Sequence, residues 1–540
     1  MSERAAARAA AAGGRRRPPF LLGAAAVAAV ALVSLPLVYL VVRAAGGGAD
    51  AWGVLGRHRT LELVGNTVVL VGAVTGVALL VGVPLAWLVA RTDVPGRRVW
   101  AVAAALPLVI PSYVAALVLL AAFGPRGLLQ QVLEEPFGVE RVPDIYGLGG
   151  AVAALAIATY PYVYLLTLGA FRDLDPALEE ASRSLGRSRM QTFRRVTLPV
   201  LRPSIGAGAL LVALYTISDF GAVSLMNYSS LTRAIFLQYR SLFDRTPAAV
   251  LSLVLVALTA IVLVLELYSR GKARYHRPSP GAARAAQRVP LRRWRWPAAG
   301  FCAAVVGFAL LLPLAVIGYW LERAFSLGRP LDAAWGAAVN SVLVSAVAAA
   351  VTVAAALPVA LLAVRYPARW TRALERLSYS SNALPGIVIA LALVFFGARY
   401  GGFLYQTLGL LVFAYAVRFF PQAVAGAHSA LLRVDPHLEE AARGLGRGPR
   451  QAFLSVTAPL VAPGLLAGAA LVFLSTMKEL PATLLLAPIG FDTLATEVWK
   501  ATTVASYSQA ALPALLLIVF SAPFVYLLTL RRGPEVDAPG

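Results

Sequence analysis

The sequence predicts an all-α membrane protein of about twelve transmembrane helices, arranged as two tandem parallel repeats. Apolar residues make up 59% of the 540 residues and charged residues only 14%, whereas a soluble domain carries about 25% charged residues. A soluble fold of this length could not bury so many apolar side chains in its cores, but a bilayer can act as their solvent. Apolar runs of membrane-crossing length recur along the chain, and motifs of the first half return in the second.

The apolar runs that could cross a bilayer number twelve, given that a spanning helix needs about 20 mostly apolar residues. The predicted spans are 20–42, 62–90, 99–123, 147–171, 204–228, 247–269, 297–320, 336–364, 379–398, 404–428, 464–487 and 510–530. The first follows Arg15, Arg16 and Arg17 and lacks a small-residue cleavage site, so we predict a spanning helix rather than a signal peptide. The run at 379–398 is short and is interrupted by Pro385.

The positive charge lies in short stretches between the apolar runs. The net charge is +22, and most of the 48 Lys and Arg residues fall in alternate connections, beginning with the tail at 1–19. Cytoplasmic connections carry an excess of basic residues, so this alternation predicts that both termini are cytoplasmic. Nucleic-acid binding would need a single basic face instead, and we predict no nucleic-acid partner.

Residues that commonly bind metals are scarce. Cys302 is the one cysteine, and the four histidines are His58, His276, His428 and His437. No disulfide can form within the chain, and no two histidines share metal-ligand spacing on one helix. The sequence therefore predicts neither a disulfide framework nor a metal site.

The two halves of the chain repeat each other. Leu178–Ala181 recurs 260 residues later as Leu438–Ala441, and nearer the start of each half the offset is 274, as between Asn66 and Asn340. Each half holds six predicted spans, an even number, so the repeats should run parallel about a pseudo-two-fold axis along the membrane normal.

A basic stretch separates the halves. Residues 271–295 contain Pro and Gly, show no apolar period, and are predicted to form a cytoplasmic linker. The first half would then be 1–270 and the second 296–540.

Each half also contains a basic loop with signals for two short helices, at 175–203 and 435–463. In the first loop, Asp175 suits the N-cap and Pro176 the first helical position. Gly186 can end that helix in the left-handed region, and a second helix follows directly. The pattern predicts a helix–Gly–helix elbow that a soluble partner could receive in a groove. An ordinary basic loop is the alternative, but two copies at equivalent positions argue against it.

The elbows resemble the EAA loop of ABC-importer permeases, in which Glu-Ala-Ala is followed by Gly, a hydrophobic residue and Pro. The matching residues are Glu180, Ala181, Gly186 and Pro199 in the first half and Glu440, Ala441, Ala442, Gly446 and Pro459 in the second, with Glu179 and Glu439 directly before the motif. Ser182 replaces the second Ala of the first loop. The resemblance covers nearly the whole chain and implies the type I ABC-importer permease fold.

Within that superfamily, a single chain with two fused six-helix halves is similar to the iron(III) importer permeases. Residues 219–224 and 478–486 are similar to the first and second halves of that group. The resemblance implies an importer permease that acts on iron(III). Permeases for thiamine, polyamines and phosphonates share the architecture, so these substrates remain alternatives.

The resemblance also implies partners. The elbow would be a coupling helix that docks on a nucleotide-binding subunit, so we expect two ABC ATPase subunits, an external solute-binding protein and membrane lipid. ATP and Mg²⁺ would be bound by the ATPase subunits, with no cofactor in this chain. The pattern G-x-x-x-x-G-K-[ST] is missing, so the chain is predicted not to be the ATPase or another enzyme. It would be a multi-pass protein of the bacterial inner membrane.

Ionisable residues inside predicted spans are costly and are functional candidates. The candidates are Asp219, Arg418, Lys478 and Glu479. Asp219 and Glu479 occupy equivalent positions in the two halves, which suggests that they face the interface between the halves. The four residues are expected either to line a gate or polar pathway or to form structural ion pairs, and the structural role is favoured.

Two other classes of function compete with an ATP-driven permease. A twelve-helix secondary transporter would need intramembrane carboxylates for proton or sodium coupling, and these are scarce. A membrane-embedded enzyme would need a constellation of His, Asp or Glu at membrane depth, and the sequence shows none. The duplicated elbow favours the permease over both.

Overall fold

The fold is helical throughout the part of the chain that the computed structural model describes. The described residues are 18–125, 127–138, 143–240, 246–269, 288–328 and 332–530. Within these ranges one β-bridge, between Thr92 and Val289, is the exception to helices and loops. The predicted all-α class is therefore confirmed, as expected for segments whose backbone polar groups must be satisfied internally in hydrocarbon.

Ten of the described helical segments are long and apolar enough to cross a membrane, and a bent pair raises the possible number to eleven. The ten are built on α2 Phe20–Ala45, α4 His58–Arg91, α6 Ser112–Phe123, α8 Leu148–Arg172, α11 Leu198–Ser218, α14 Thr246–Ser269, α15 Arg295–Val306 with α16 Leu312–Ser326, α17 Asp332–Arg365, α20 Leu408–Leu432 and α23 Ala458–Met477. The bent pair joins α18 Arg369–Ser378 to α19 Gly386–Arg399. The last predicted span lies in α26, Tyr507–Leu530.

The remaining helices are short and connect the long ones. They are α3 Gly48–Trp52, η1 Gly53–Gly56, α5 Arg97–Ala103, η2 Leu106–Val109, α7 Leu128–Phe137, α9 Pro176–Ser184, α10 Arg189–Thr192, η3 Phe193–Thr197, α12 Gly221–Leu225, α13 Leu231–Arg240, η4 Arg292–Trp294, η5 Gly307–Leu311, η6 Ser380–Ala383, α21 Pro436–Gly444, α22 Pro449–Ala452, η7 Phe453–Thr457, α24 Pro481–Leu486 and α25 Leu494–Thr503. Three of them, η3, η5 and η7, are π-helical turns.

The predicted span 99–123 is broken rather than continuous. It divides into α5, η2 and α6, with Pro107 at the start of η2 and Pro111 directly before α6. Proline cannot donate a backbone hydrogen bond and clashes with the preceding turn, so a helix does not continue through two of them at this spacing.

Two further predicted spans, 204–228 and 464–487, are also broken. Their long helices end at Ser218 and Met477, and short helices restart a few residues later. The expectation that Asp219, Lys478 and Glu479 lie within spanning helices is therefore wrong. All three residues fall in the breaks, where the backbone leaves the helical path.

The described chain forms two compact units, and neither coincides with a predicted half. The α20 unit is drawn from 1–46 and 339–492, and the α8 unit from 47–338 and 493–540. In the α20 unit, α20 packs along α23, and α2 packs on α18, α19 and α20. In the α8 unit, α4, α8 and α11 pack together, while α6 contacts α8, α16, α25 and α26. Each unit thus combines helices from both halves of the sequence.

The division of the sequence at a linker stays a prediction. Of the predicted linker 271–295, residues 271–287 lie outside the described residues. The described end of the linker contacts the end of α4, because Val289 N donates to Arg91 O at 2.8 Å and Leu291 N donates to Asp93 Oδ1 at 2.8 Å.

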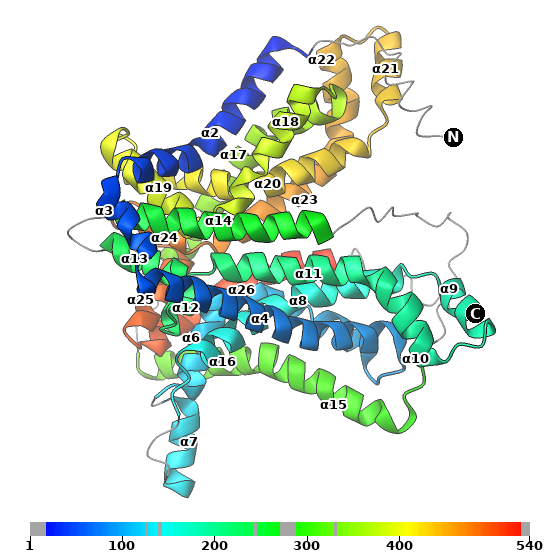
Figure 1. The fold of residues 1–540 in the computed structure, drawn as a ribbon, viewed down its shortest axis with the longest axis vertical. Helices are drawn as coiled ribbons and strands as arrows, with labels where there is room; N and C mark the ends of the chain where they lie inside the picture. Colours follow the sequence, from blue (N-terminus) through cyan, green and yellow to red (C-terminus); the bar gives the residue numbers. More distant parts are fainter. Residues whose placement is uncertain are drawn as a thin grey trace. The chain divides into compact units, whose positions relative to one another are not determined.

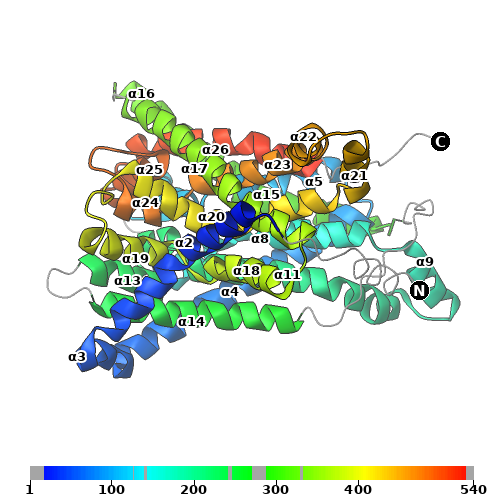
Figure 2. The ribbon, with the colours of Figure 1, turned by 90° about the horizontal axis from the view of Figure 1, so that it is seen from above.

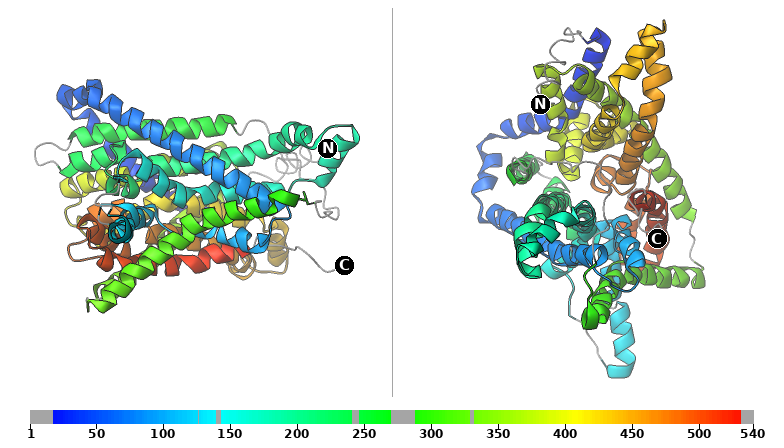
Figure 3. Two further views of the ribbon diagram at one scale, coloured as in Figure 1. Left: turned by 90° about the horizontal axis from the view of Figure 1, so that it is seen from below. Right: turned by 90° about the vertical axis from the view of Figure 1, so that its right-hand side faces the viewer.

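Each unit has two distinguishable ends. In the α8 unit, α9 and α10 lie at one end of the long helices, and α12, α13 and α25 lie at the other (Figure 1, Figure 2). In the α20 unit, α21 and α22 lie at one end and α24 at the other (Figure 2). We call these the elbow end and the distal end of each unit. Helix α7 projects sideways from the α8 unit (Figure 3).

Close backbone approach at glycine allows the long helices of the α8 unit to pack. A Cβ atom added at Gly208 of α11 would lie 2.9 Å from the Cα atom of Val163 in α8. Small residues let helices approach in this way, which is the main source of packing energy between helices in lipid. Gly206, on the same helix, has open space at the equivalent position.

We expect Gly208→Ala to destabilise the protein by about 1–3 kcal/mol, because the added methyl group meets backbone that cannot rotate away. The matched control Gly206→Ala should leave stability unchanged or slightly raised, since alanine is the better helix former. Thermal unfolding of the purified protein in detergent measures both. Equal effects at the two positions would contradict the packing account.

Candidate functional site

Both predicted elbows are present as two short helices joined at a glycine. In the first, α9 begins after Asp175, whose Oδ1 accepts a hydrogen bond from Ala177 N at 2.9 Å. In the second, α21 begins after Asp435, whose Oδ1 accepts from His437 N at 2.9 Å. These bonds confirm the predicted N-caps, which satisfy backbone donors that a helix start leaves open.

The turn between the two helices needs glycine. Gly186 has φ +82° and Gly446 has φ +85°, both in the left-handed region that side chains other than glycine rarely adopt. In the first elbow the next helix starts with a capping box, in which Gln191 N donates to Ser188 Oγ at 3.3 Å and Ser188 N donates to Gln191 Oε1 at 3.1 Å. The predicted helix–Gly–helix geometry is therefore confirmed.

The first glutamate of each elbow faces inward and fixes the elbow to the end of a long helix. Glu179 forms an ion pair with Arg91, the last residue of α4, and accepts a hydrogen bond from Thr197 Oγ1 at 2.7 Å. The side chains of Arg91 and Glu179 are 6% and 13% exposed. Removing one partner of such a pair costs about 3–5 kcal/mol, because a charge is left buried without its counterion.

The second elbow repeats this arrangement. Glu439 lies 3.5 Å from Arg365, the last residue of α17, and accepts a hydrogen bond from Thr457 Oγ1 at 3.0 Å. It also accepts a hydrogen bond from Arg443 of its own helix at 2.5 Å. In both elbows the threonine ends a π-helical turn, which turns its hydroxyl toward the glutamate.

The second glutamate of each elbow faces outward. Glu180 and Glu440 are exposed, and Glu440 lies 3.3 Å from His437 of its own helix. Leu185 and Leu445, directly before the glycines, are 77% and 86% exposed. Each elbow therefore presents an acidic residue and an exposed leucine at its tip, a combination suited to a protein partner rather than to solvent alone.

The other predicted loop residues divide between the surface and the interior. Ala181, Ala441, Pro199 and Pro459 are exposed, and Ala442 is buried. Ser182, which replaces the motif alanine, is buried and lies 3.1 Å from Thr192 Oγ1. Its hydroxyl joins α9 to α10, a contact that the aliphatic Ala442 cannot make.

Sequence reasoning missed the arginines and threonines that hold the inner glutamates. Arg91 and Arg365 stand at equivalent positions 274 residues apart, and Thr197 and Thr457 stand 260 apart. This recurrence was the available signal. It could not by itself show that the arginine at the end of one long helix reaches a loop that is distant in sequence.

The predicted pathway candidate Asp219 caps helices at the distal end of the α8 unit. Its Oδ1 accepts from Ala222 N at 3.0 Å and from Val223 N at 3.4 Å, in the first turn of α12. Ser112 Oγ, at the start of α6, donates to its other carboxylate oxygen. A carboxylate is stabilised by the N-terminal dipoles of both helices.

Glu479 has the same position in the α20 unit with a different partner. Its Oε2 accepts from Ala482 N at 2.9 Å, in the first turn of α24. Its Oε1 occupies the space that a Cβ would fill at Gly386, the first residue of α19. Gly386 is the counterpart of Ser112 at the offset of 274. The first half therefore pairs the shorter side chain of Asp219 with a serine, and the second half pairs the longer side chain of Glu479 with a glycine.

The two basic candidates also lie in the α20 unit. Arg418 of α20 donates from Nη1 to Leu384 O at 2.5 Å, and it interacts electrostatically with Glu479. Lys478 is the C-cap residue of α23, so Lys478 and Glu479 do not share one helix. These contacts support a structural role for the carboxylates. A role of the four residues in a gate or pathway stays a prediction.

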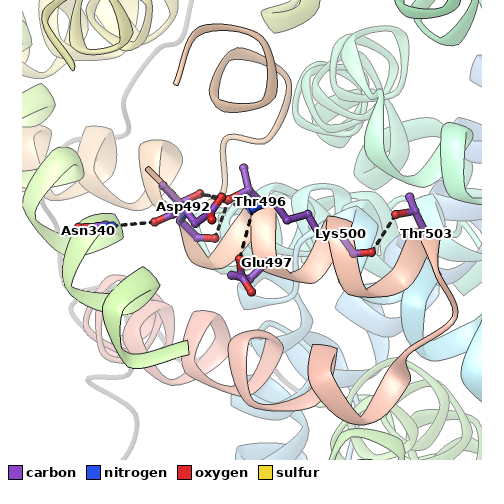
Figure 4. Close-up of polar contacts among 7 residues, drawn as sticks. Asn340, Asp492, Thr496, Glu497, Lys500 and Thr503 are labelled. Atoms are coloured by element: carbon purple, nitrogen blue, oxygen red, sulfur yellow. Dashed lines mark hydrogen bonds and ion pairs between the residues drawn. The ribbon is translucent and has the colours of Figure 1, made fainter. Parts of the chain in front are cut away.

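A second pair of repeated contacts joins an asparagine of a long helix to a backbone oxygen that is distant in sequence, once in each unit. Asn66 Nδ2 donates to Ser229 O at 3.1 Å, directly before the start of α13. Asn340 Nδ2 donates to Asp492 O at 3.0 Å, and Figure 4 shows this amide pointing at the backbone that leads into α25. The sequence predicted that the two asparagines occupy equivalent positions of the repeat, but it did not indicate these backbone contacts.

No group of three or more His, Cys, Asp or Glu side chains that could hold a metal ion occurs among the described residues. The single cysteine, Cys302, is buried.

Comparison with known proteins places the chain in a family. The model of the family described as "Binding-protein-dependent transport system inner membrane component" matches residues 82–274 and again residues 352–531. The chain belongs to this family. The double match confirms the predicted tandem repeat and the permease resemblance.

Individual relatives agree with the family. The Fe(3+)-transport system permease protein FbpB 2 of Haemophilus influenzae is 35% identical over 92% of this chain and 95% of its own length. The ferric transport system permease protein FbpB of Actinobacillus pleuropneumoniae is 24% identical over 71% of this chain and 58% of its own length. The molybdate/tungstate transport system permease protein WtpB of Thermococcus kodakarensis is 26% identical over 45% of this chain and 92% of its own length.

The pairing of Asp219 with Ser112 can be tested by introducing the residue types found at the equivalent positions of the second half. We expect Asp219→Glu to destabilise the protein because the longer side chain meets Ser112, and Ser112→Gly to destabilise it by removing a donor. The double variant Ser112→Gly/Asp219→Glu should recover part of the loss, because it recreates the pairing of Glu479 with Gly386. Thermal unfolding of the four proteins in detergent should give a coupling free energy of about 1–3 kcal/mol. Strictly additive effects would show that the side chains do not share one space.

Proposed function

We propose that this chain is the membrane-spanning subunit of an ATP-driven importer and that it carries iron(III) across the bacterial inner membrane. The observation that carries the proposal is the duplicated elbow, fixed inward by Glu179 and Glu439 and presenting Leu185 and Leu445 outward. Such an elbow can transmit force, because its outer face is available to a partner while its inner face is tied to a long helix.

The elbows would each receive one ATPase subunit, so that two ATPase subunits assemble with one chain. ATP and Mg²⁺ would be bound by those subunits. Movement of an ATPase subunit would pull on the elbow, and the ion pair with Arg91 or Arg365 would pass the displacement to α4 or α17. An external binding protein would deliver the cargo, in keeping with the description of the family.

The orientation follows from the same proposal. The elbow end of each unit would face the cytoplasm, where ATP is available, and the distal end would face the binding protein. Both termini would be cytoplasmic, as the distribution of arginine predicts.

Iron(III) is the substrate that the relatives favour. The relative that covers 92% of this chain carries iron(III) in its name, and so does one that covers 71%. The molybdate and tungstate relative covers only 45%. Thiamine, polyamines and phosphonates remain alternatives on the sequence resemblance alone.

The exposed leucines of the elbows test the docking of the ATPase. We expect the double variant Leu185→Glu/Leu445→Glu to lose about tenfold or more of the ATPase activity that copurifies with the affinity-tagged chain, because a charge replaces an apolar contact at the centre of the interface. Leu327→Glu, at a position that is 58% exposed and outside the elbows, serves as the control. If the elbow variant retains wild-type copurification, the elbows are not the docking sites.

The substrate is tested in vesicles that contain the complete transporter. We expect radiolabelled iron(III), delivered on the cognate binding protein, to accumulate when ATP is supplied to the ATPase side. Molybdate, thiamine, spermidine and a phosphonate, each supplied in the same way, should not accumulate. ATP-dependent accumulation of one of these compounds instead of iron(III) would change the proposed substrate but not the proposed class of transporter.

A further inference from the structure

Helix α18 lies nearly perpendicular to α19, the helix that follows it. The segment Arg369–Ala383 and the helix Gly386–Arg399 are bent by 99° relative to each other. Helix α18 packs on α2 and contacts α20, and Glu375 lies 3.5 Å from His428 of α20. Because His428 is close to the end of α20 that leads into the elbow, α18 is at the elbow end of its unit.

The buried face of α18 carries polar side chains that form hydrogen bonds within the protein. Thr371 and Ser378 are buried, and Ser378 Oγ donates to Glu375 O at 2.6 Å. Thr371 Oγ1 accepts a hydrogen bond from Ala368 N at 2.9 Å at the start of the helix. This face therefore holds α18 to the bundle and leaves the opposite face uncovered.

The uncovered face has an arginine strip beside an apolar strip. Arg369, Arg372 and Arg376 are exposed and lie at positions i, i+3 and i+7, which is one line along a helix. Trp370 and Leu377, 42% and 52% exposed, lie beside them with Ala373. The three arginines, Ala373 and Leu377 line a hollow of about 570 Å³.

No carboxylate of the described chain neutralises the strip. The ion pairs among the described residues include none to Arg369, Arg372 or Arg376, and Glu375 of the same helix faces His428. Three guanidinium groups in line, without a carboxylate partner, attract an anion that can accept several hydrogen bonds at once.

The first half of the chain lacks the strip. At the offset of 274, Pro95 and Val102 stand where Arg369 and Arg376 stand in the second half. A general excess of cytoplasmic arginine would not require three of them in one line on one helix of one half. The strip is therefore a feature of α18 itself and not of the repeated framework.

We propose that α18 is an interfacial helix that binds the headgroup of an acidic phospholipid in the leaflet at the elbow end. The arginines receive the phosphate groups, and Leu377 and Trp370 lie against the upper acyl chains. This division of one exposed face into basic and apolar strips is what an amphipathic helix needs at the boundary between headgroups and hydrocarbon. The proposal rests on the membrane location of the family and not on the identity of the cargo.

Lipid binding can be measured on the purified chain through Trp370. Brominated phosphatidylglycerol and brominated phosphatidylcholine are titrated separately into the protein in detergent, and the quenching in a Trp370→Phe variant is subtracted. We expect half-maximal quenching at an at least tenfold lower mole fraction of phosphatidylglycerol, because each basic residue favours an anionic surface over a neutral one. The assay uses neither ATP nor iron(III), so its failure leaves the proposed transport function untouched.

Matched variants assign the preference to the strip. Arg369→Gln/Arg372→Gln/Arg376→Gln should abolish the preference for phosphatidylglycerol. Arg292→Gln/Arg293→Gln/Arg295→Gln removes three exposed arginines of another basic stretch and should retain it. Replacement of the three α18 arginines by lysine keeps the positive charge. This variant should keep a weaker preference for phosphatidylglycerol, and a retained preference confirms that the helix is folded.

Three results would overturn the proposal. Equal quenching of the wild type by both lipids would remove the preference itself. An equal loss of the preference for phosphatidylglycerol in both triple glutamine variants would show that the preference depends only on net charge. Displacement of the brominated lipid by millimolar inorganic phosphate would show a site for free phosphate instead of a lipid headgroup.

Discussion

The arrangement of the elbows depends on one buried interaction, the ion pair between an elbow glutamate and the arginine that ends a long helix. Glu179 with Arg91 and Glu439 with Arg365 make the same connection in the two halves. Without this pair the elbow would be attached through its two chain ends alone, and a force applied at its tip would bend those connections. With it, the tip, the inner glutamate and the long helix form one mechanical element, stabilised further by the hydroxyl of a threonine.

The distal end uses carboxylates for a related purpose. Asp219 and Glu479 sit where a long helix stops and a short one starts, and each accepts backbone hydrogen bonds from the new helix. A helix start in hydrocarbon would otherwise expose donors without partners. The carboxylates therefore explain how the chain can break within so apolar a run, which makes a cap the most economical account of charges that insertion disfavours.

The sequence predicted the class, the positions of most spans, the repeat and the elbows, because these depend on composition, local periodicity and local capping. Asp175, Gly186 and their counterparts act on neighbouring residues, so their signals are readable in a single segment. The breaks at Asp219 and Glu479 were missed because an apolar run does not reveal whether its helix is continuous. The inner ion pairs were missed because they join residues far apart in the chain, and a repeat shows that positions correspond without showing what they contact.

The two elbows are attached in the same way but with different strengths. Each inner glutamate is shared between the arginine of a long helix and an arginine of its own helix. Glu179 pairs closely with Arg91 and lies 3.8 Å from Arg183, whereas Glu439 accepts from Arg443 at 2.5 Å and lies 3.5 Å from Arg365. The first elbow is thus held chiefly to its long helix and the second chiefly within itself. The contact between the inner glutamate and the end of the long helix is therefore closer in the first elbow than in the second, although the two backbones repeat.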